Sequence, residues 1–166
     1  MSAIGRLSGK VALITGTSSG IGPGTAILFC KLGAEVAITD RNVYNLTTTA
    51  VECEKGNGKK PFTLNGDLTN EDFVKQLVDE TVKHYGKLDI LVNNAAIWKA
   101  GTIETTSLGQ YDDIMTVNVR ATYHLTMLAV PHLVKTKGSI VNVSSVNGVR
   151  AVSFVNLSWL VMKYLK

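Results

Sequence analysis

Residues Thr15–Gly22, with the sequence Thr-Gly-Thr-Ser-Ser-Gly-Ile-Gly, lie between an apolar run, Val11–Ile14, and a helix-like segment, Thr25–Leu32. Strand, glycine-rich turn and helix form the context in which a glycine motif binds a nucleotide. Glycines let the backbone turn tightly and approach a diphosphate closely, and the start of the following helix offers free N–H groups to the anion. The stretch therefore predicts a nucleotide-binding turn, with an ordinary strand-to-helix loop as the alternative.

The spacing of the glycines narrows the class of nucleotide site. Gly16, Gly20 and Gly22 form the pattern G-x-x-x-G-x-G. This differs from the G-x-G-x-x-G fingerprint, and no lysine follows Gly22, as a P-loop requires. The pattern therefore points to a nucleotide site of another type.

Composition bounds the class of protein. The 166 residues predict a single domain. Hydrophobic residues make up 45% of the chain and charged residues 18%, which supplies enough apolar material for a buried core and argues against disorder. The net charge of the chain is +4. The Lys and Arg residues are scattered along the sequence, with no run longer than Lys59-Lys60. We therefore expect a mildly basic surface and no nucleic-acid partner.

Cysteine usage and hydropathy suggest a compartment. Cys30 and Cys53 have neither metal-ligand nor C-x-x-C spacing, and Met1–Leu7 contains no apolar signal region. No stretch is long and apolar enough to span a bilayer. These features predict a cytoplasmic protein with free thiols and no membrane partner.

Apolar runs with strand character alternate along the chain with helix-like segments. Predicted strands occupy residues 10–15, 35–39, 61–64, 88–92 and 139–143. Predicted helices occupy residues 20–33, 43–55, a segment that begins at 69–72 and ends at Gly86, and a longer one from 107 toward 130, where Pro131 disturbs it. This alternation predicts an α/β fold with a doubly wound parallel sheet.

Polar residues follow each predicted strand. Ligands of such sheets bind outside the carboxyl ends of the strands, where neighbouring loops meet. The residues that fall at these ends are Thr15, Asp40, Asp67, Asn93 and Ser144. We expect them to border a common site.

Three charged residues follow the second and third strands. Asp40 can accept hydrogen bonds from both ribose hydroxyls of adenosine and repels a 2′-phosphate, whereas the neighbouring Arg41 binds phosphate well. A surface Asp-Arg pair at a turn is the alternative interpretation. Asp67 is expected either to reach the adenine or to cap the next helix.

Asparagines and serines mark the second half of the chain. Asn93–Ala96 ends the fourth strand, where small residues let the backbone approach a flat ring and Asn can lock a loop. Asn118 lies inside the long helix, where Asn is mildly unfavourable, so it has either a specific task or the role of a polar plug that kinks the helix. Ser144 and Ser145 end the fifth strand and are either site residues or part of a turn.

Together, the order and spacing of these elements resemble a short-chain dehydrogenase/reductase of the compact kind. The matching elements are Thr15–Gly22, Asp40, Asp67, Asn93–Ala96, Asn118 and Ile140–Ser145, within roughly residues 7–151. The resemblance implies a Rossmann-like sheet of five strands in the order 3-2-1-4-5, with the family's C-terminal strands and helices missing. It also implies an NAD-linked oxidoreductase of a small alcohol or carbonyl substrate, with NADP less favoured than NAD.

The resemblance assigns roles residue by residue. The glycine motif holds the cofactor diphosphate, Asp40 selects NAD, and Asp67 contacts the adenine. Asn118 and Ser145 match two of the family's four catalytic residues, and the serine polarises the substrate carbonyl. The cofactor-binding residues implied in this way are Gly16, Ser18, Ser19, Gly20, Ile21, Gly22, Asp40, Arg41, Asp67, Leu68, Asn94, Ala95 and Ala96.

The sequence also departs from the family pattern. The family's Tyr-x-x-x-Lys is expected thirteen residues after Ser145, where Ser158 and Met162 stand instead. This pair acts as the acid/base element, because the lysine lowers the pKa of the tyrosine. We therefore expect little or no turnover, and a non-catalytic nucleotide-binding or interaction protein that pairs with a full-length homologue is the alternative. Pro23 and Ala96 are smaller departures within the cofactor motifs.

The resemblance of the sequence to the family stops abruptly near Ala151. We therefore divide the chain into a dinucleotide-binding domain, residues 1–151, and a tail, residues 152–166. Val152-Ser153 can be encoded by the consensus start of an intron, and we interpret the tail as intron read-through, with drift or a frameshift as alternatives. Without further strands, the apolar strand 139–143 is an exposed edge. We therefore expect the chain to form homo- or hetero-oligomers.

Overall fold

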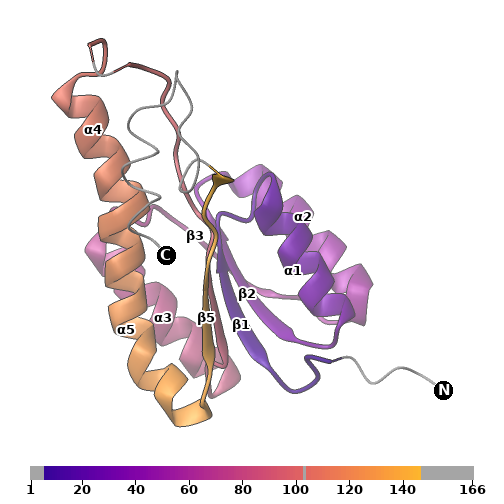
Figure 1. Ribbon diagram of the computed structural model, residues 1–166. Helices are drawn as coiled ribbons and strands as arrows, with labels where there is room; N and C mark the ends of the chain where they lie inside the picture. Colours follow the sequence, from indigo (N-terminus) through magenta and orange to yellow (C-terminus); the bar gives the residue numbers. More distant parts are fainter. Residues whose placement is uncertain (1–5, 103, 147–166) are drawn as a thin grey trace.

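The computed structural model describes residues 6–102 and 104–146. Strands and helices alternate through this part of the chain (Figure 1). In chain order the elements are β1 (Val11–Thr15), α1 (Ile21–Lys31), β2 (Glu35–Asp40), α2 (Val43–Asn57), β3 (Phe62–Asn65), α3 (Glu71–Tyr85), β4 (Ile90–Asn93), α4 (Leu108–Met115), the π-helix η1 (Thr116–Ala121), α5 (Thr122–Thr136) and β5 (Ser139–Asn142). The alternation predicted from the sequence is confirmed.

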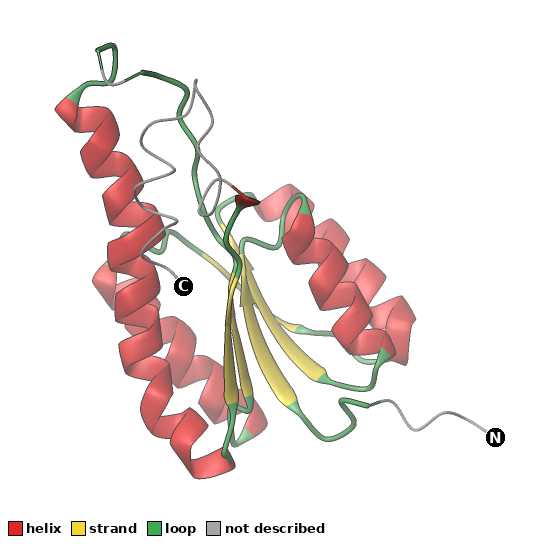
Figure 2. Cartoon of the chain, viewed as in Figure 1, coloured by secondary structure: helices red, strands yellow, loops and turns green. Residues whose placement is uncertain are grey.

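β1 lies at the centre of a five-stranded sheet with the strand order β3-β2-β1-β4-β5. All adjacent pairs are parallel, so the predicted doubly wound topology is confirmed. Helices α1 and α2 cover one face of the sheet, and α3 and α5 cover the other (Figure 2). All five residues of β1 are buried, which is what a near-continuous apolar run produces in a sheet covered on both faces.

Alternate residues of the strands fill two cores. Leu13 belongs to the buried cluster on one face of the sheet, together with Leu77 of α3 and Leu125 of α5. Ile14, the next residue, belongs to the core on the other face, which α1 and α2 complete. Cys30 and Cys53 are buried in that second core as free thiols. Both cores hold the carboxyl ends of the strands in register, and the candidate site lies at these ends.

Helix α3 shows how local signals set the ends of an element. The Asn70 side chain accepts hydrogen bonds from the backbone N–H groups of Asp72 and Phe73, and Gly86 ends the helix in the left-handed conformation. Val74, Leu77 and Val78 form the buried stripe that the helical spacing predicts. At its last turn, the Tyr85 hydroxyl donates to the carbonyl of Val36 and accepts from the N–H of Phe62, which ties β2 to the edge strand β3.

The long predicted helix near residue 107 differs from expectation in two ways. It is interrupted by the π-helix η1, and it continues to Thr136 instead of being disturbed at Pro131. Pro131 lies on the exposed side of α5, while Leu125, Ala129 and Leu133 are buried against the sheet. Packing of the buried stripe outweighs the hydrogen bond that a proline removes from a helix.

Candidate functional site

The turn between β1 and α1 leaves no room for side chains at two of its glycines. A Cβ at Gly16, which has a φ of 70°, would lie 2.7 Å from the Cα of Ala95. A Cβ at Gly22 would lie 2.0 Å from the carbonyl oxygen of Gly16. Gly20 is the N-cap of α1, and no side-chain hydrogen bond caps this helix within the described residues. The first backbone N–H groups of α1 are therefore available to an anion.

Asn94 fastens the glycine-rich turn to the end of β4. Its side-chain amide donates to the carbonyl oxygens of Thr15 and Gly16, both at 2.9 Å. In return, the Thr15 hydroxyl accepts hydrogen bonds from the N–H groups of Asn94 and Ala95, at 3.1 and 3.0 Å. Because these bonds join segments nearly eighty residues apart, they place the backbone of residues 94–95 directly against the turn.

Asp40 lies at the end of β2 and is held by backbone groups. One carboxylate oxygen accepts a hydrogen bond from the N–H of Ser18 at 3.2 Å, and the other accepts from the N–H of Asn42 at 3.0 Å. The Asp40 carbonyl accepts from the side-chain amide of Asn65 at 2.7 Å. The carboxylate is therefore fixed beside the glycine-rich turn, and it retains lone pairs for a ligand.

Asp67 forms an ion pair with Arg41, with 3.5 Å between Oδ2 and Nη1. Its other carboxylate oxygen accepts from the N–H and the hydroxyl of Thr69, both at 2.9 Å. Desolvation raises the pKa of Asp67, but the hydrogen bonds from Thr69 and the charge of Arg41 outweigh it and lower the pKa below its usual range. The helix that follows is capped by Asn70, so the capping role considered for Asp67 is not realised.

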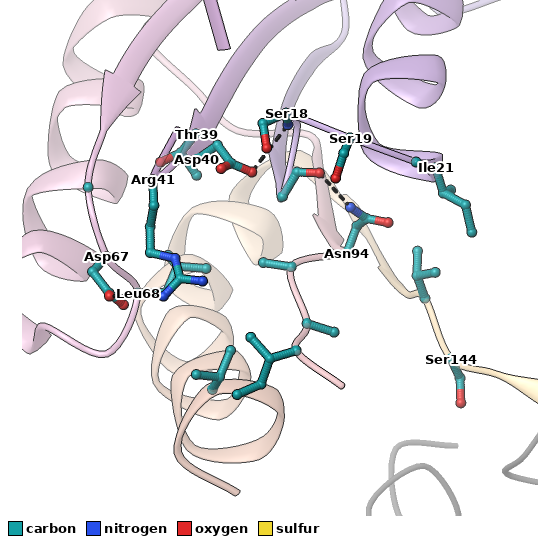
Figure 3. A pocket seen from close by; sticks show the side chains of 18 residues that line it. Ser18, Ser19, Ile21, Thr39, Asp40, Arg41, Asp67, Leu68, Asn94 and Ser144 are labelled. Carbon is teal, nitrogen blue, oxygen red and sulfur yellow. Dashed lines mark hydrogen bonds and ion pairs between the residues drawn. The ribbon is translucent and has the colours of Figure 1, made fainter. Parts of the chain in front are cut away.

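These residues border one cavity of about 470 Å³ at the carboxyl ends of the strands (Figure 3). The volume lies within the range typical of small-molecule sites. The cavity is lined by twelve of the residues implied as cofactor-binding, namely Gly16, Ser18, Ser19, Gly20, Ile21, Asp40, Arg41, Asp67, Leu68, Asn94, Ala95 and Ala96. Gly22 is buried behind the turn and supports Gly16 instead of lining the cavity.

Ser144, which was expected to border the site as a strand-end residue, also lines the cavity. Sequence reasoning missed five lining residues, which are Thr39, Gly66, Ile97, Val117 and Val143. Each of Thr39, Gly66 and Val143 directly adjoins a residue placed at a strand end, so their positions could have been found from the strand pattern. Ile97 and Val117 carry no such signal. They reach the cavity because the loop after β4 and the π-helix η1 meet there.

Asn118 lies in the π-helix η1 and is 3% exposed. Its side-chain amide donates to the carbonyl of Ile97 at 2.9 Å, and its side-chain oxygen accepts from the N–H of Ile97 at 2.8 Å. This reciprocal pair fixes the loop after β4, and π-helical turns are common at functional sites. Asn118 borders a separate small cavity of about 20 Å³. Neither of the two predicted catalytic residues, Asn118 and Ser145, lines the large cavity.

Some predictions fall outside the described residues. Ser158, Met162 and the tail 152–166 belong to the range 147–166, so the interpretation of the tail stays a prediction. Between residues 6 and 146, leaving out residue 103, no helix combines the length and apolar character needed to cross a membrane. The same residues contain no cluster of three or more His, Cys, Asp or Glu side chains that could hold a metal ion.

A doubly wound sheet with a glycine-rich turn, a fixed carboxylate and a cavity at the strand ends is the architecture of a dinucleotide-binding domain. The short chain dehydrogenase family profile matches residues 10–157. The chain belongs to the short-chain dehydrogenase/reductase family, as its motifs suggested.

Curated relatives support the same family. The chain is 41% identical over 146 residues to the 3-oxoacyl-[acyl-carrier-protein] reductase FabG of Thermotoga maritima, a match that covers 87% of this chain and 58% of the relative. It is 37% identical to the 11-beta-hydroxysteroid dehydrogenase-like 2 protein of Arabidopsis thaliana, over 86% of this chain and 47% of the relative. The chain thus spans about half the length of the curated relatives it matches.

Solved structures match the fold closely. The carveol dehydrogenase of Mycobacterium avium, in complex with NAD, superposes with a TM-score of 0.90 at 26% identity, over 96% of this chain and 62% of that protein. An NAD⁺-bound xylitol dehydrogenase superposes with a TM-score of 0.90 at 26% identity, over 95% of this chain and 61% of that protein.

Proposed function

We propose that this chain is the dinucleotide-binding part of an NAD(P)-dependent oxidoreductase that interconverts alcohols with ketones or aldehydes. The observation that carries the proposal is the cavity of about 470 Å³ between the glycine-rich turn and the carboxylate of Asp40. The names of the relatives and the NAD-bound structural neighbours support the same class of reaction.

The residues present fit a dinucleotide. Gly16 and Gly22 form a cradle that any Cβ would fill, and such a cradle lets a diphosphate approach the backbone and the start of α1. The Asp40 carboxylate can accept hydrogen bonds from ribose hydroxyls while Ser18 and Asn42 hold it in place. We propose that the cofactor is NAD, because a fixed carboxylate at this position repels a 2′-phosphate. A bound NAD would supply hydride-transfer chemistry at this site.

The remaining roles belong to side chains near the end of β5 and in η1. We propose that Ser145, which follows β5, donates a hydrogen bond to the substrate carbonyl oxygen. Asn118 does not line the cavity and acts through Ile97, because its two hydrogen bonds to Ile97 keep the wall of the cavity in place. Ser145 would orient the substrate and Asn118 would hold the loop that contains Ile97, but neither group is a general acid near neutral pH.

Turnover is expected to be negligible in this chain. Ser158 and Met162 stand where the family has its tyrosine and lysine, so no phenol stands at the family's acid/base position to supply the proton that must accompany the hydride. General acid–base groups contribute roughly 10²–10⁴-fold to rates. The same substitutions favour the second candidate function, a nucleotide-binding protein without catalysis that acts by pairing with a full-length homologue.

Calorimetric titration of the full chain with NAD and NADP tests the binding proposal. Gly22→Ala is expected to weaken NAD binding at least about tenfold, since its methyl group collides with the Gly16 carbonyl and displaces the turn. Gly24→Ala is the matched control, because a Cβ there meets no atom within 4 Å in the described part of the chain. Equal affinities of the two variants would contradict the proposed site. Tighter binding of NADP than of NAD by the unmodified chain would contradict the cofactor preference.

An assay of ketone reduction separates the two candidate functions. The unmodified chain, with saturating NADH and a panel of ketones, is expected to show a rate far below the usual range of about 1–10³ s⁻¹. An ordinary enzymatic rate would refute the non-catalytic alternative. It would also require another proton donor, for which Lys163, the residue next to Met162, is the candidate.

A further inference from the structure

The rim of the cavity carries three charges near the carboxyl ends of β2 and β3. Asp40, Arg41 and Asp67 all line the same cavity. Figure 3 shows the Asp40 side chain directed toward Ser18, while the Arg41 side chain extends the other way, to Asp67 and Leu68. The two neighbouring residues therefore present their charged groups to different parts of the cavity.

The position of the Arg41 guanidinium depends on Asp67. Nη1 of Arg41 lies 3.5 Å from Oδ2 of Asp67. The backbone of Arg41 is fixed independently, because the Asn65 side-chain amide donates to the carbonyls of Asp40 and Arg41 at 2.7 and 3.0 Å. Removing the charge of Asp67 therefore releases only the side chain of Arg41 and leaves the turn in place.

A guanidinium beside the ribose end of a dinucleotide site would otherwise favour a 2′-phosphate, because its planar fork binds phosphate oxygens with two hydrogen bonds. Here two carboxylates outnumber the single guanidinium, so the rim is net negative. We propose that Asp67 is a positioning residue for cofactor choice: its ion pair holds Arg41 away from the 2′-position and, together with Asp40, disfavours dinucleotides that carry a 2′-phosphate. This inference rests on the proposed dinucleotide site.

The expected effect is moderate. The side chains of Arg41 and Asp67 are 63% and 44% exposed, and ion pairs this exposed are weakened by solvent and salt. We therefore expect Asp67→Asn to raise the affinity for NADP relative to NAD by about twofold to fivefold at low ionic strength. Asparagine retains an oxygen that can accept the hydrogen bonds of Thr69, so the local turn keeps its geometry.

The experiment is calorimetric titration of the full chain and four variants with NADP and NAD, at low and high salt. Asp67→Asn is expected to increase the NADP-to-NAD affinity ratio, and the increase should shrink at high salt. Asp67→Glu, which keeps the charge, should restore the ratio of the unmodified chain. Arg41→Gln combined with Asp67→Asn should cancel the gain, because the phosphate ligand is then absent. Asp40→Asn provides the comparison for loss of the other carboxylate.

Each outcome decides the inference. An unchanged NADP-to-NAD ratio in Asp67→Asn, or an equal gain in the double variant that lacks Arg41, would overturn it while leaving the dinucleotide site intact. If the unmodified chain has native circular dichroism but binds neither cofactor, the proposed function fails and the inference fails with it.

Discussion

At the scale of single residues, a few side chains act by bonding the backbone of distant segments. Asn94 holds the glycine-rich turn, Asp40 holds Ser18, and Asn118 holds Ile97. Asp89 does the same at the amino ends of β1 and β4, where its buried carboxylate accepts from the N–H of Val11 at 2.9 Å. Side chains of this kind connect strands before any ligand is present.

Asp89 is predicted to make stability depend on pH. Burial raises the pKa of Asp89, but the N–H of Val11 and the ammonium groups of Lys87 and Lys10, both within 3.1 Å, outweigh burial and lower it. Since the unfolded value is about 3.9, the stabilisation is fully present above that pH and is lost as pH falls through the lower folded value. Asp89→Asn should therefore cost about 1.5–3 kcal/mol at pH 7 and flatten the acid limb of the stability curve.

Urea unfolding followed by circular dichroism at pH 7 and at several values below pH 4 measures this effect. Glu80→Gln is a suitable control, because Glu80 makes an exposed ion pair with Lys83 on α3. If Asp89→Asn and Glu80→Gln gave the same pH dependence, the buried carboxylate would not be its source.

At the scale of elements, packing overrides local preference in α5. Pro131 lies inside the helix, where proline removes a backbone hydrogen bond and clashes with the preceding turn. Pro23 occupies the third position of α1, where the N–H groups have no intrahelical partner. The same residue type is therefore costly in one helix and tolerated in the other.

Replacing the two prolines tests this difference. Pro131→Ala is expected to raise the free energy of unfolding by about 1–3 kcal/mol, since the restored helical hydrogen bond exceeds the entropy gained by the unfolded chain. Pro23→Ala should change stability by about 1 kcal/mol or less. Chemical denaturation of both variants provides the measurement. A destabilised Pro131→Ala variant would show that the proline shapes the packing of α5 on the sheet.

At the scale of the whole molecule, the strands of the described sheet differ in how far they are buried from solvent. β1, β2 and β4 are largely buried, whereas every residue of β5 is exposed, including Ile140 at 41% and Val141 at 46%. Neither lysine nor proline, which commonly blunt an edge strand, occurs in β5. We expect this edge to favour self-association of the chain.

Light scattering across a range of protein concentrations tests that expectation. The unmodified chain should show an average mass that rises with concentration, and Val141→Lys should reduce the rise because it places a charge on the edge strand. Val43→Lys is the control, since Val43 is 60% exposed at the start of α2, away from β5. A monomer whose mass does not change with concentration would refute the expectation.

The sequence alone determined the local elements and their order. Glycine spacing, apolar runs and capping residues act over a few neighbouring positions, so the turn at Gly16, the end of β2 at Asp40 and the start of α3 at Asn70 could all be predicted. The parallel sheet followed because alternating strands and helices allow few topologies. The family could be recognised from the same spacing.

Only the tertiary structure decided which of these groups meet. The pairing of Asp67 with Arg41, the bonds of Asn94 to residues 15 and 16, and the approach of Ile97 and Val117 to the cavity join segments far apart in the chain. Such contacts depend on strand register and helix packing, which no local pattern encodes. For the same reason, the burial of one face of α5 kept Pro131 within a helix that its local preference would have ended.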